Sequence, residues 1–376
     1  MAKVYRAGND DGTEEKSLQV RLREEIILPL LDREQADGVL LPRQTSGGGI
    51  TFSLFKSDDL DSLSLLSPVQ PVNAASLVSD LTFKEPSDRV AALLRPCEIR
   101  ALVELEKLQQ VDLDHLFIIG IDCLGTCESD EYKELLREEN EALDDQYQTE
   151  MRRGSIESIP LRDACRFCGE PEPLHADVKV ALVGSEEGEL LLEAGSEEGE
   201  DFLSGLNLEE ASLPDRREEL LEEIRDRRKE QWQEEADEFR DRIDDINGLI
   251  EVLDLCRGCY NCRSACPICY CRECVFTTIT FEHEGRKYIE WAERKGSIKM
   301  PTDTLLFHLT RLNHMGLSCV ACGQCESACP VGISLLKIFK LIGEEAQGFF
   351  SYLPGESVDE PLPLTTYEEE EDFENI

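Results

Sequence analysis

The stretch Cys256-Arg-Gly-Cys259-Tyr-Asn-Cys262-Arg-Ser-Ala-Cys266-Pro267 decides the organisation of this sequence, because it carries the pattern C-x2-C-x2-C-x3-C-P. The pattern returns at Cys319-Val-Ala-Cys322-Gly-Gln-Cys325-Glu-Ser-Ala-Cys329-Pro330. Since proline fixes φ and cannot extend a helix, each run is expected to turn away after its last thiol. Structural zinc sites usually use paired C-x2-C knuckles, whereas a triple run closed by C-x3-C-P is typical of [4Fe–4S] ligands.

The doubled pattern predicts two [4Fe–4S] clusters of the bacterial ferredoxin type. Three thiolates on one tight loop bind three corners of a cube, and the fourth cysteine of each run binds the other cluster. The first cluster is expected on Cys256, Cys259, Cys262 and Cys329. The second is expected on Cys319, Cys322, Cys325 and Cys266. Such clusters transfer single electrons, so two-electron chemistry would require a further cofactor, and a flavin supplies that conversion.

Composition restricts the class of partner. The chain has 376 residues, of which 41% are hydrophobic, and this length suits two or three domains with a sizeable core. Its 80 acidic residues against 39 basic ones give a net charge of −41, which argues against nucleic acid and anionic membrane surfaces. A saline habitat and ordinary solubility with acidic tails both explain this charge.

The cysteine content predicts metal ligands. No apolar run is long enough to span a membrane, and the first residues lack the apolar core of a signal peptide. Sixteen cysteines in a chain that is not exported indicate metal binding rather than disulfides, in a reducing cytoplasm.

The N-terminal half predicts an α/β domain. Val90–Leu94 and Leu116–Ile121 are apolar runs typical of buried strands, and a helical pattern beginning near Ile99 separates them. The loops that follow these strands, Arg95–Glu98 and Asp122–Cys127, should lie where ligands bind at the carboxyl ends of a parallel sheet.

Other segments of this half are weaker signals. Residues 1–20 are expected to be mobile, and a helix is expected over Val20–Leu31. A strand over Asp37–Pro42 leads into Gln44–Ile50, whose glycines suit either a phosphate loop or a plain hairpin loop. A further strand is expected over Val178–Val183.

A long charged helix should begin near Pro214, with Ser212 as its cap. Phe281–Ile289 is interpreted as a hairpin or strand, and Thr304–His314 as a helix. The tail, which includes Glu368–Asp372, is expected to be solvated and disordered. Four histidines suit surface or packing roles, with proton donation near a flavin as the alternative: His175, His283, His308 and His314.

The remaining cysteines leave alternatives open. Cys165 and Cys168 form a C-x2-C knuckle, to which Cys123 and Cys127 would add two ligands of a third cluster or a zinc ion. Buried or free thiols are the alternative. Three further thiols have no assigned role: Cys269, Cys271 and Cys274.

Four stretches point to a known family: Arg95-Pro-Cys-Glu-Ile-Arg-Ala101, Ile119-Gly-Ile-Asp-Cys-Leu-Gly-Thr126, Cys256 to Cys274, and His314 through Cys319 to Gly332. Together they resemble the beta subunits of coenzyme F420-reducing hydrogenases and F420-dependent formate dehydrogenases. The cluster motifs alone occur in many iron–sulfur proteins, but their combination with the two preceding loops is more specific. The resemblance covers most of residues 30–350.

This resemblance implies FAD on an α/β domain, in the loops after the strands. The implied flavin-lining residues are Arg95, Pro96, Cys97, Glu98, Arg100, Gly120, Asp122, Gly125 and Thr126. Arg100 would pair with a phosphate. The predicted organisation is an α/β flavin-binding domain in 1–205, a charged helical connector in 206–250, a two-cluster ferredoxin-like α+β module with an insertion in 251–345, and an acidic tail in 346–376.

The first functional hypothesis is therefore an iron–sulfur flavoprotein subunit of a larger oxidoreductase. A formate dehydrogenase, hydrogenase or heterodisulfide-reductase-like partner would exchange electrons with the clusters, and FAD would exchange hydride with coenzyme F420 or NAD(P). The second hypothesis is a flavin-free adaptor that only relays electrons. A third is a zinc-rich structural protein, which would be colourless when purified without oxygen.

Overall fold

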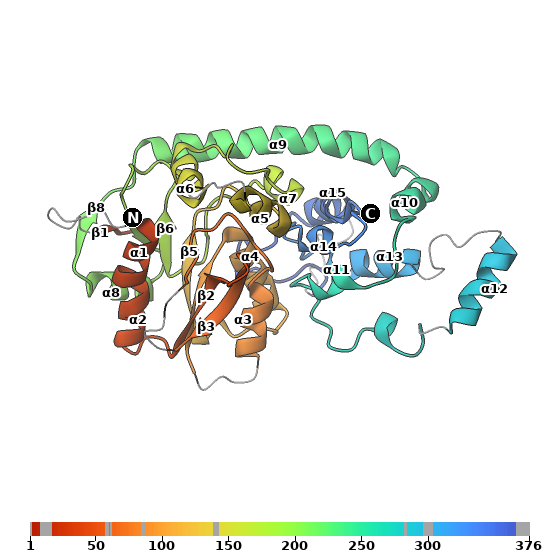
Figure 1. The fold of residues 1–376 in the computed structure, drawn as a ribbon, viewed down its shortest axis with the longest axis horizontal. Helices are drawn as coiled ribbons and strands as arrows, with labels where there is room; N and C mark the ends of the chain where they lie inside the picture. Colours follow the sequence, from red (N-terminus) through yellow and green to blue (C-terminus); the bar gives the residue numbers. More distant parts are fainter. Residues whose placement is uncertain are drawn as a thin grey trace, which may run out of the picture.

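The computed structural model describes residues 2–7, 17–56, 60, 62–83, 88–137, 143–281, 284–295 and 304–365. Its strands form one eight-stranded sheet in the order β3-β2-β4-β5-β6-β7-β1-β8 (Figure 1). They are β1 Val4–Ala7, β2 Gly38–Gln44, β3 Ile50–Phe55, β4 Val90–Leu94, β5 Leu116–Ile121, β6 Val178–Ala181, β7 Leu191–Ala194 and β8 Leu208–Ala211.

Helices surround this sheet and make up the C-terminal region. Those before the sheet ends are α1 Leu18–Leu22, a π-helical turn Arg23–Ile27, α2 Leu28–Asp32, α3 Ala75–Thr82, α4 Pro96–Lys107, α5 Ser129–Arg137, α6 Leu143–Arg153, α7 Asp163–Arg166 and α8 Glu197–Ser204. Those after it are α9 Arg216–Arg242, α10 Ile246–Leu253, α11 Asn261–Ser264, α12 Gly285–Lys295, α13 Thr304–Met315, α14 Gln324–Ser327 and α15 Leu335–Phe349.

The predicted β-α-β unit is confirmed. β2, β4, β5 and β6 pair in parallel, and α4 connects β4 to β5. Every residue of β4 and β5 is buried, as expected for strands covered on both faces. Leu94 pairs with Gly120, so the loops after these two strands start side by side at one edge of the sheet.

Side chains point alternately to the two faces of β4, and each face contributes to a separate hydrophobic core. Ala91 and Leu93 face a core with α1, α2 and α6, whereas Ala92 and Leu94 face a core with α3 and α4. The second core continues without interruption into α13 and α15, through residues such as Phe339. The cysteine-rich C-terminal region is therefore packed directly against one face of the sheet.

Helix α9 spans the top edge of the molecule in Figure 1, from the sheet to α10. Apolar residues at three- and four-residue steps predict a stripe along this helix: Leu221, Ile224, Trp232, Ala236, Phe239, Ile243 and Ile246. The first five of these residues are buried. The stripe stops there, because Ile246 is 52% exposed. The stripe thus fastens the helix to both regions, since α9 contacts α7 and α15.

Three local predictions are wrong. Val4–Ala7 is not mobile but pairs with β7 and β8 inside the sheet. The N-cap residue of α9 is Asp215 rather than Ser212, and no side chain caps that end. Phe281–Ile289 was expected to form a hairpin or strand, yet helix α12 begins at Gly285, because Tyr288, Ile289 and Ala292 follow a helical spacing.

The expected α+β character of the C-terminal module is also absent from the described part of residues 246–365, which contains helices and loops but no strand. After α15 the chain returns to α4, where Tyr352 Oη and the Gly355 N–H both donate to Glu104 Oε1. Glu368–Asp372 and His283 lie outside the described residues. Among the described helices, none is both long and apolar enough to cross a membrane.

Candidate functional site: three sets of cysteine thiols

The two C-terminal cysteine loops share one backbone conformation. Gly258 and Ala321, at the third position of each run, have φ of +65° and +53°. Tyr260 and Gly323, at the fifth position, have φ of +60° and +74°. Left-handed φ is costly for residues with a Cβ, so Tyr260 and Ala321 store backbone strain that the fold maintains. Each run then enters a short helix, and these helices, α11 and α14, pack against each other.

One set of thiols, here the second C-terminal set, lines a closed apolar cavity of about 20 Å³. Its members are Cys266, Cys319, Cys322 and Cys325. Burial raises the pKa of Cys319 to about 11 and that of Cys322 to about 12, and the nearby Cys266 thiol adds to both shifts. Cys266 thus lies with three thiols of the other run, although about fifty residues separate them.

The first C-terminal set consists of Cys256, Cys259, Cys262 and Cys329. Burial raises the pKa of Cys262 to about 11; Arg311 opposes this shift, and the thiols of Cys256, Cys259 and Cys329 add to it. His308 Nε2 lies 3.5 Å from Cys256 Sγ. Burial, aided by Arg311, lowers the pKa of His308 to about 4, so this imidazole is neutral at pH 7. His308 is therefore placed to donate a hydrogen bond to a Cys256 thiolate.

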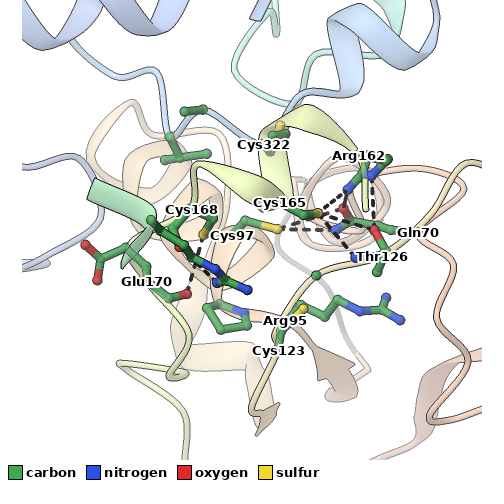
Figure 2. A pocket seen from close by; sticks show the side chains of 16 residues that line it. Gln70, Arg95, Cys97, Cys123, Thr126, Arg162, Cys165, Cys168, Glu170 and Cys322 are labelled. Atoms are coloured by element: carbon green, nitrogen blue, oxygen red, sulfur yellow. Dashed lines mark hydrogen bonds between the residues drawn. The ribbon is translucent and has the colours of Figure 1, made fainter. Parts of the chain in front are cut away.

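A third group of thiols lies at the edge of the sheet and differs from the predicted set. Figure 2 shows Cys97, Cys165 and Cys168 around a cavity of about 30 Å³, which Cys123 also lines. These four thiols are called the sheet set. Cys127 does not line the cavity, because its Sγ donates to Pro68 O and its backbone is bridged to Val69. Cys97, assigned to the flavin by resemblance, takes its place.

Cys165 has the environment of a metal-binding thiolate. Burial acts to raise its pKa, but the Arg162 guanidinium and hydrogen bonds from Thr126 outweigh this and lower it. Thr126 N lies 3.3 Å and Arg162 Nη2 3.6 Å from Cys165 Sγ. By contrast, burial raises the pKa of Cys123 to about 11. The shift at Cys165 favours the thiolate form that binds a metal, whereas the shift at Cys123 opposes it.

The residues implied for the flavin do not form one pocket. Arg95, Pro96, Cys97, Gly125 and Thr126 line the sheet-set cavity.

The other four are held elsewhere. Glu98 is fully buried and accepts from the N–H groups of Ala74 and Arg95. Arg100 Nε donates to Pro354 O. A Cβ on Gly120 would meet Pro173 Cβ at 2.4 Å. Asp122 is 3% exposed and ion-paired with Arg217.

A larger groove of about 370 Å³ adjoins the sheet set, between α9 and the segment after α6. It shares Arg228 with the sheet-set cavity, and Leu124, Arg166 and Arg227 also line it. Periodicity did not reveal this groove, because its arginines interrupt the apolar stripe of α9. Arg228, which is buried on that helix, was the missed signal.

The other candidate residues do not line the two thiol cavities, although Cys269 lies near Cys266. Cys271 is exposed, and Cys269 and Cys274 are half-buried. His175 Nε2 contacts Glu356 O, and His314 is exposed. Within the described ranges, no three His, Cys, Asp or Glu side chains converge as a single metal ion requires. A four-iron cube needs a wider cage than one ion, so this observation concerns mononuclear sites.

Comparison with known proteins gives the family. Residues 87–213 match the family model that describes the C terminus of the beta subunit of coenzyme F420 hydrogenase/dehydrogenase. F420-dependent formate dehydrogenase subunit beta of Methanocaldococcus jannaschii is 27% identical over 361 residues, covering 89% of this chain and 90% of the relative. F420-dependent formate dehydrogenase 1 subunit beta of Methanococcus maripaludis is 27% identical over 371 residues, covering 89% of each.

Two further matches are more limited. Sulfhydrogenase 2 subunit beta of Pyrococcus furiosus is 30% identical over 129 residues, covering 26% of this chain and 37% of the relative. A chain of the F420-reducing [NiFe] hydrogenase complex from Methanosarcina barkeri aligns with 14% identity and a TM-score of 0.43, covering 65% of this chain and 93% of its own. The family resemblance rests on the first two relatives and the family model, which confirm it: over most of its length the chain is similar to the beta subunits of coenzyme F420 hydrogenases and dehydrogenases, which are oxidoreductase subunits.

Proposed function

We propose that this chain is an electron-transfer subunit that passes electrons between [4Fe–4S] clusters and FAD, and from there to a soluble hydride carrier. The observation that carries this proposal is the continuity of the three thiol sets. The first and second C-terminal sets are joined through the α11–α14 contact. The second C-terminal set and the sheet set share a wall, since Cys322, Val320 and Ala321 line both cavities.

The donor groups fit clusters in all three sets. Each set offers four cysteines, and the spacing of the C-terminal runs is consistent with iron–sulfur ligation. The two C-terminal loops hold their strained backbone in the same way, which suits a shared ligand role. We therefore assign Cys97, Cys123, Cys165 and Cys168 to a third cluster, in place of the set that contained Cys127. Clusters bound at these positions would relay single electrons.

Among the described cavities, the groove beside α9 suits an anionic cofactor. Its volume of about 370 Å³ lies within the usual range of ligand pockets, and three arginines line it in a chain of net charge −41. Arg227 and Arg166 would bind phosphate oxygens, while the apolar Ile156, Ile159 and Leu161 would exclude water. A flavin bound there would convert between one-electron and two-electron steps. The proposed position lies next to the sheet set through Arg228, which lines both cavities.

The names of the relatives favour particular partners. The two formate dehydrogenase subunits are named for dependence on F420, which supports coenzyme F420 as the carrier and the catalytic subunit of a formate dehydrogenase or hydrogenase as the partner. NAD(P) and a heterodisulfide-reductase-like subunit are the alternatives. Within this proposal, residues 1–205 and 251–345 are the flavin and cluster domains, which 206–250 connects.

Cofactor analysis tests the proposal. The chain is purified without oxygen, and iron, zinc and acid-extractable flavin are counted per chain, before and after reconstitution. About twelve irons and one FAD support the full route, and about eight irons would leave the sheet set without a cluster. Clusters without flavin, even after reconstitution with FAD, would exclude hydride transfer and leave the flavin-free adaptor.

A further inference from the structure

Three buried arginines surround the sheet set. Arg95, Arg162 and Arg228 are 8%, 7% and 5% exposed, and all three line the cavity that the four thiols share. In the described part of the chain, none of them forms an ion pair with a carboxylate. This is unexpected in a chain with 80 acidic residues, because a buried charge is normally paired.

Neutral oxygen atoms hold the guanidinium groups in place. Arg95 Nη2 donates to Ser67 O at 2.7 Å and to Val69 O at 3.2 Å. Arg162 donates to Thr126 Oγ1 at 3.0 Å and to Gln70 Oε1 at 2.7 Å. Each group is thus oriented, but its positive charge is not neutralised by these acceptors.

Arg228 is also held by neutral oxygen atoms. Glu170 lines the same cavity and Glu128 lies near enough to Arg162 for their charges to interact, but neither forms an ion pair with the three arginines. Arg228 donates to Leu124 O and to Cys168 O, both carbonyls of loops that carry the sheet set. Glu98 lies near Arg95, but its two oxygens accept the backbone N–H groups of Ala74 and Arg95 instead of binding the guanidinium.

The thiols supply the missing negative charge. Arg162 Nη2 lies 3.6 Å from Cys165 Sγ, and Arg95 lies close enough to Cys123 for their charges to interact. A [4Fe–4S] cluster with four thiolates is an anion that gains one more negative charge on reduction. Nearby positive charge therefore stabilises the reduced form more than the oxidised form, and net charge is one of the factors that set cluster potentials.

The two C-terminal sets have less buried positive charge near their thiols. They share one buried arginine, Arg311, which is 4% exposed and lies near Cys262, Cys266 and Cys325. Arg162 of the sheet set adds a weaker contribution, because it is near enough to Cys322 for their charges to interact. Lys340 lies near Cys319 but is ion-paired with Glu344. Of the three thiol sets in the described chain, the sheet set therefore has the most buried arginines around it.

We propose that Arg95, Arg162 and Arg228 form a cationic cage that raises the reduction potential of the sheet-set cluster above those of the two C-terminal clusters. This inference rests on the proposed third cluster. Electrons that enter at the C-terminal sets then pass downhill to the sheet set, beside the arginine groove. The cage thus gives the route a direction without any contact between these arginines and the reacting carrier.

A reduction titration of the full chain, followed by electron paramagnetic resonance without oxygen, tests the cage. A Cys97→Ser variant identifies which signal belongs to the sheet set. We expect that signal to appear first as the potential is lowered. In Arg162→Gln, the ratio of reduced to oxidised sheet-set cluster at a fixed potential should fall about tenfold, a shift of about 59 mV. Arg162→Lys, which keeps the positive charge, should restore most of the ratio found in the unchanged chain.

Matched controls separate this proposal from the proposed function. Arg311→Gln should shift the C-terminal signals and leave the sheet-set signal unchanged. A chain with about twelve irons whose sheet-set potential is the lowest, or does not move in Arg162→Gln and Arg95→Gln, would overturn the cage but keep the electron route. A chain with about eight irons would overturn the third cluster and the cage together.

Discussion

The two cysteine-rich regions hold their thiols in opposite ways. In the C-terminal region, three ligands of each set come from one run of seven residues, and left-handed backbone at equivalent positions shapes both loops. At the edge of the sheet, the four thiols are spread from Cys97 to Cys168 and come from the first turn of α4, the loop after β5, and α7 with the residues that follow it. The first arrangement is encoded locally, whereas the second depends on the register of β4 and β5.

The two arrangements should therefore be sensitive to different substitutions. A run of closely spaced cysteines keeps its ligands together as long as the loop forms. The sheet set needs the parallel pairing of β4 with β5, the anchoring of α9 and the loop before α7. Variants that weaken the sheet region should therefore affect the sheet set first.

The largest effect is expected from the thiols themselves. Cys97→Ser should remove about four irons per chain, because one ligand of the sheet set is lost. Cys127→Ser is the matched control, since this buried cysteine is one loop away but donates to Pro68 O. Iron analysis after purification without oxygen measures both. Loss of iron in Cys127→Ser alone would reinstate the set predicted from sequence.

A smaller effect is expected from the buried ion pair that joins Arg217 of α9 to Asp122. Arg217→Met leaves the Asp122 carboxylate buried without its bidentate partner, so the sheet region should lose about 3–5 kcal/mol of stability. Arg240→Met on the same helix breaks only half-exposed pairs and should cost about 0–1 kcal/mol.

Chemical denaturation with iron release measures this pair of variants. In Arg217→Met, the sheet-set signal should disappear at a lower denaturant concentration than the C-terminal signals. Equal stability of Arg217→Met and Arg240→Met would show that the buried ion pair does not maintain the scaffold.

The smallest effect on stability is expected from glycine substitutions in the two C-terminal loops. Gly258→Ala and Gly323→Ala both place a Cβ on left-handed backbone, at a cost of about 1–2 kcal/mol. The Cβ at 258 would meet open space, but at 323 it would lie 2.4 Å from Ala164 Cβ in α7. Gly323→Ala should therefore be the less stable variant in thermal denaturation. A larger loss in Gly258→Ala would contradict the contact between this loop and the sheet region.

Periodicity and apolar runs predicted much of the scaffold. The strands over Val90–Leu94 and Leu116–Ile121 and the helix over Thr304–His314 are found with nearly the same bounds. Short or mixed patterns gave wrong predictions. Strand β1 was missed because it has only four residues, and α12 was missed because its segment has both helical and strand-like spacing. In those segments, tertiary pairing rather than local preference selects the structure.

The grouping expected of the C-terminal cysteines follows from the sequence, because ligand spacing within one tight loop is a property of consecutive residues. The β-α-β order that places two loops at the edge of the sheet follows from it too. The grouping of Cys97 rather than Cys127 with Cys123, Cys165 and Cys168, and the three arginines around them, emerge only in the folded chain. Side chains from distant segments meet only once strand register and helix packing are fixed.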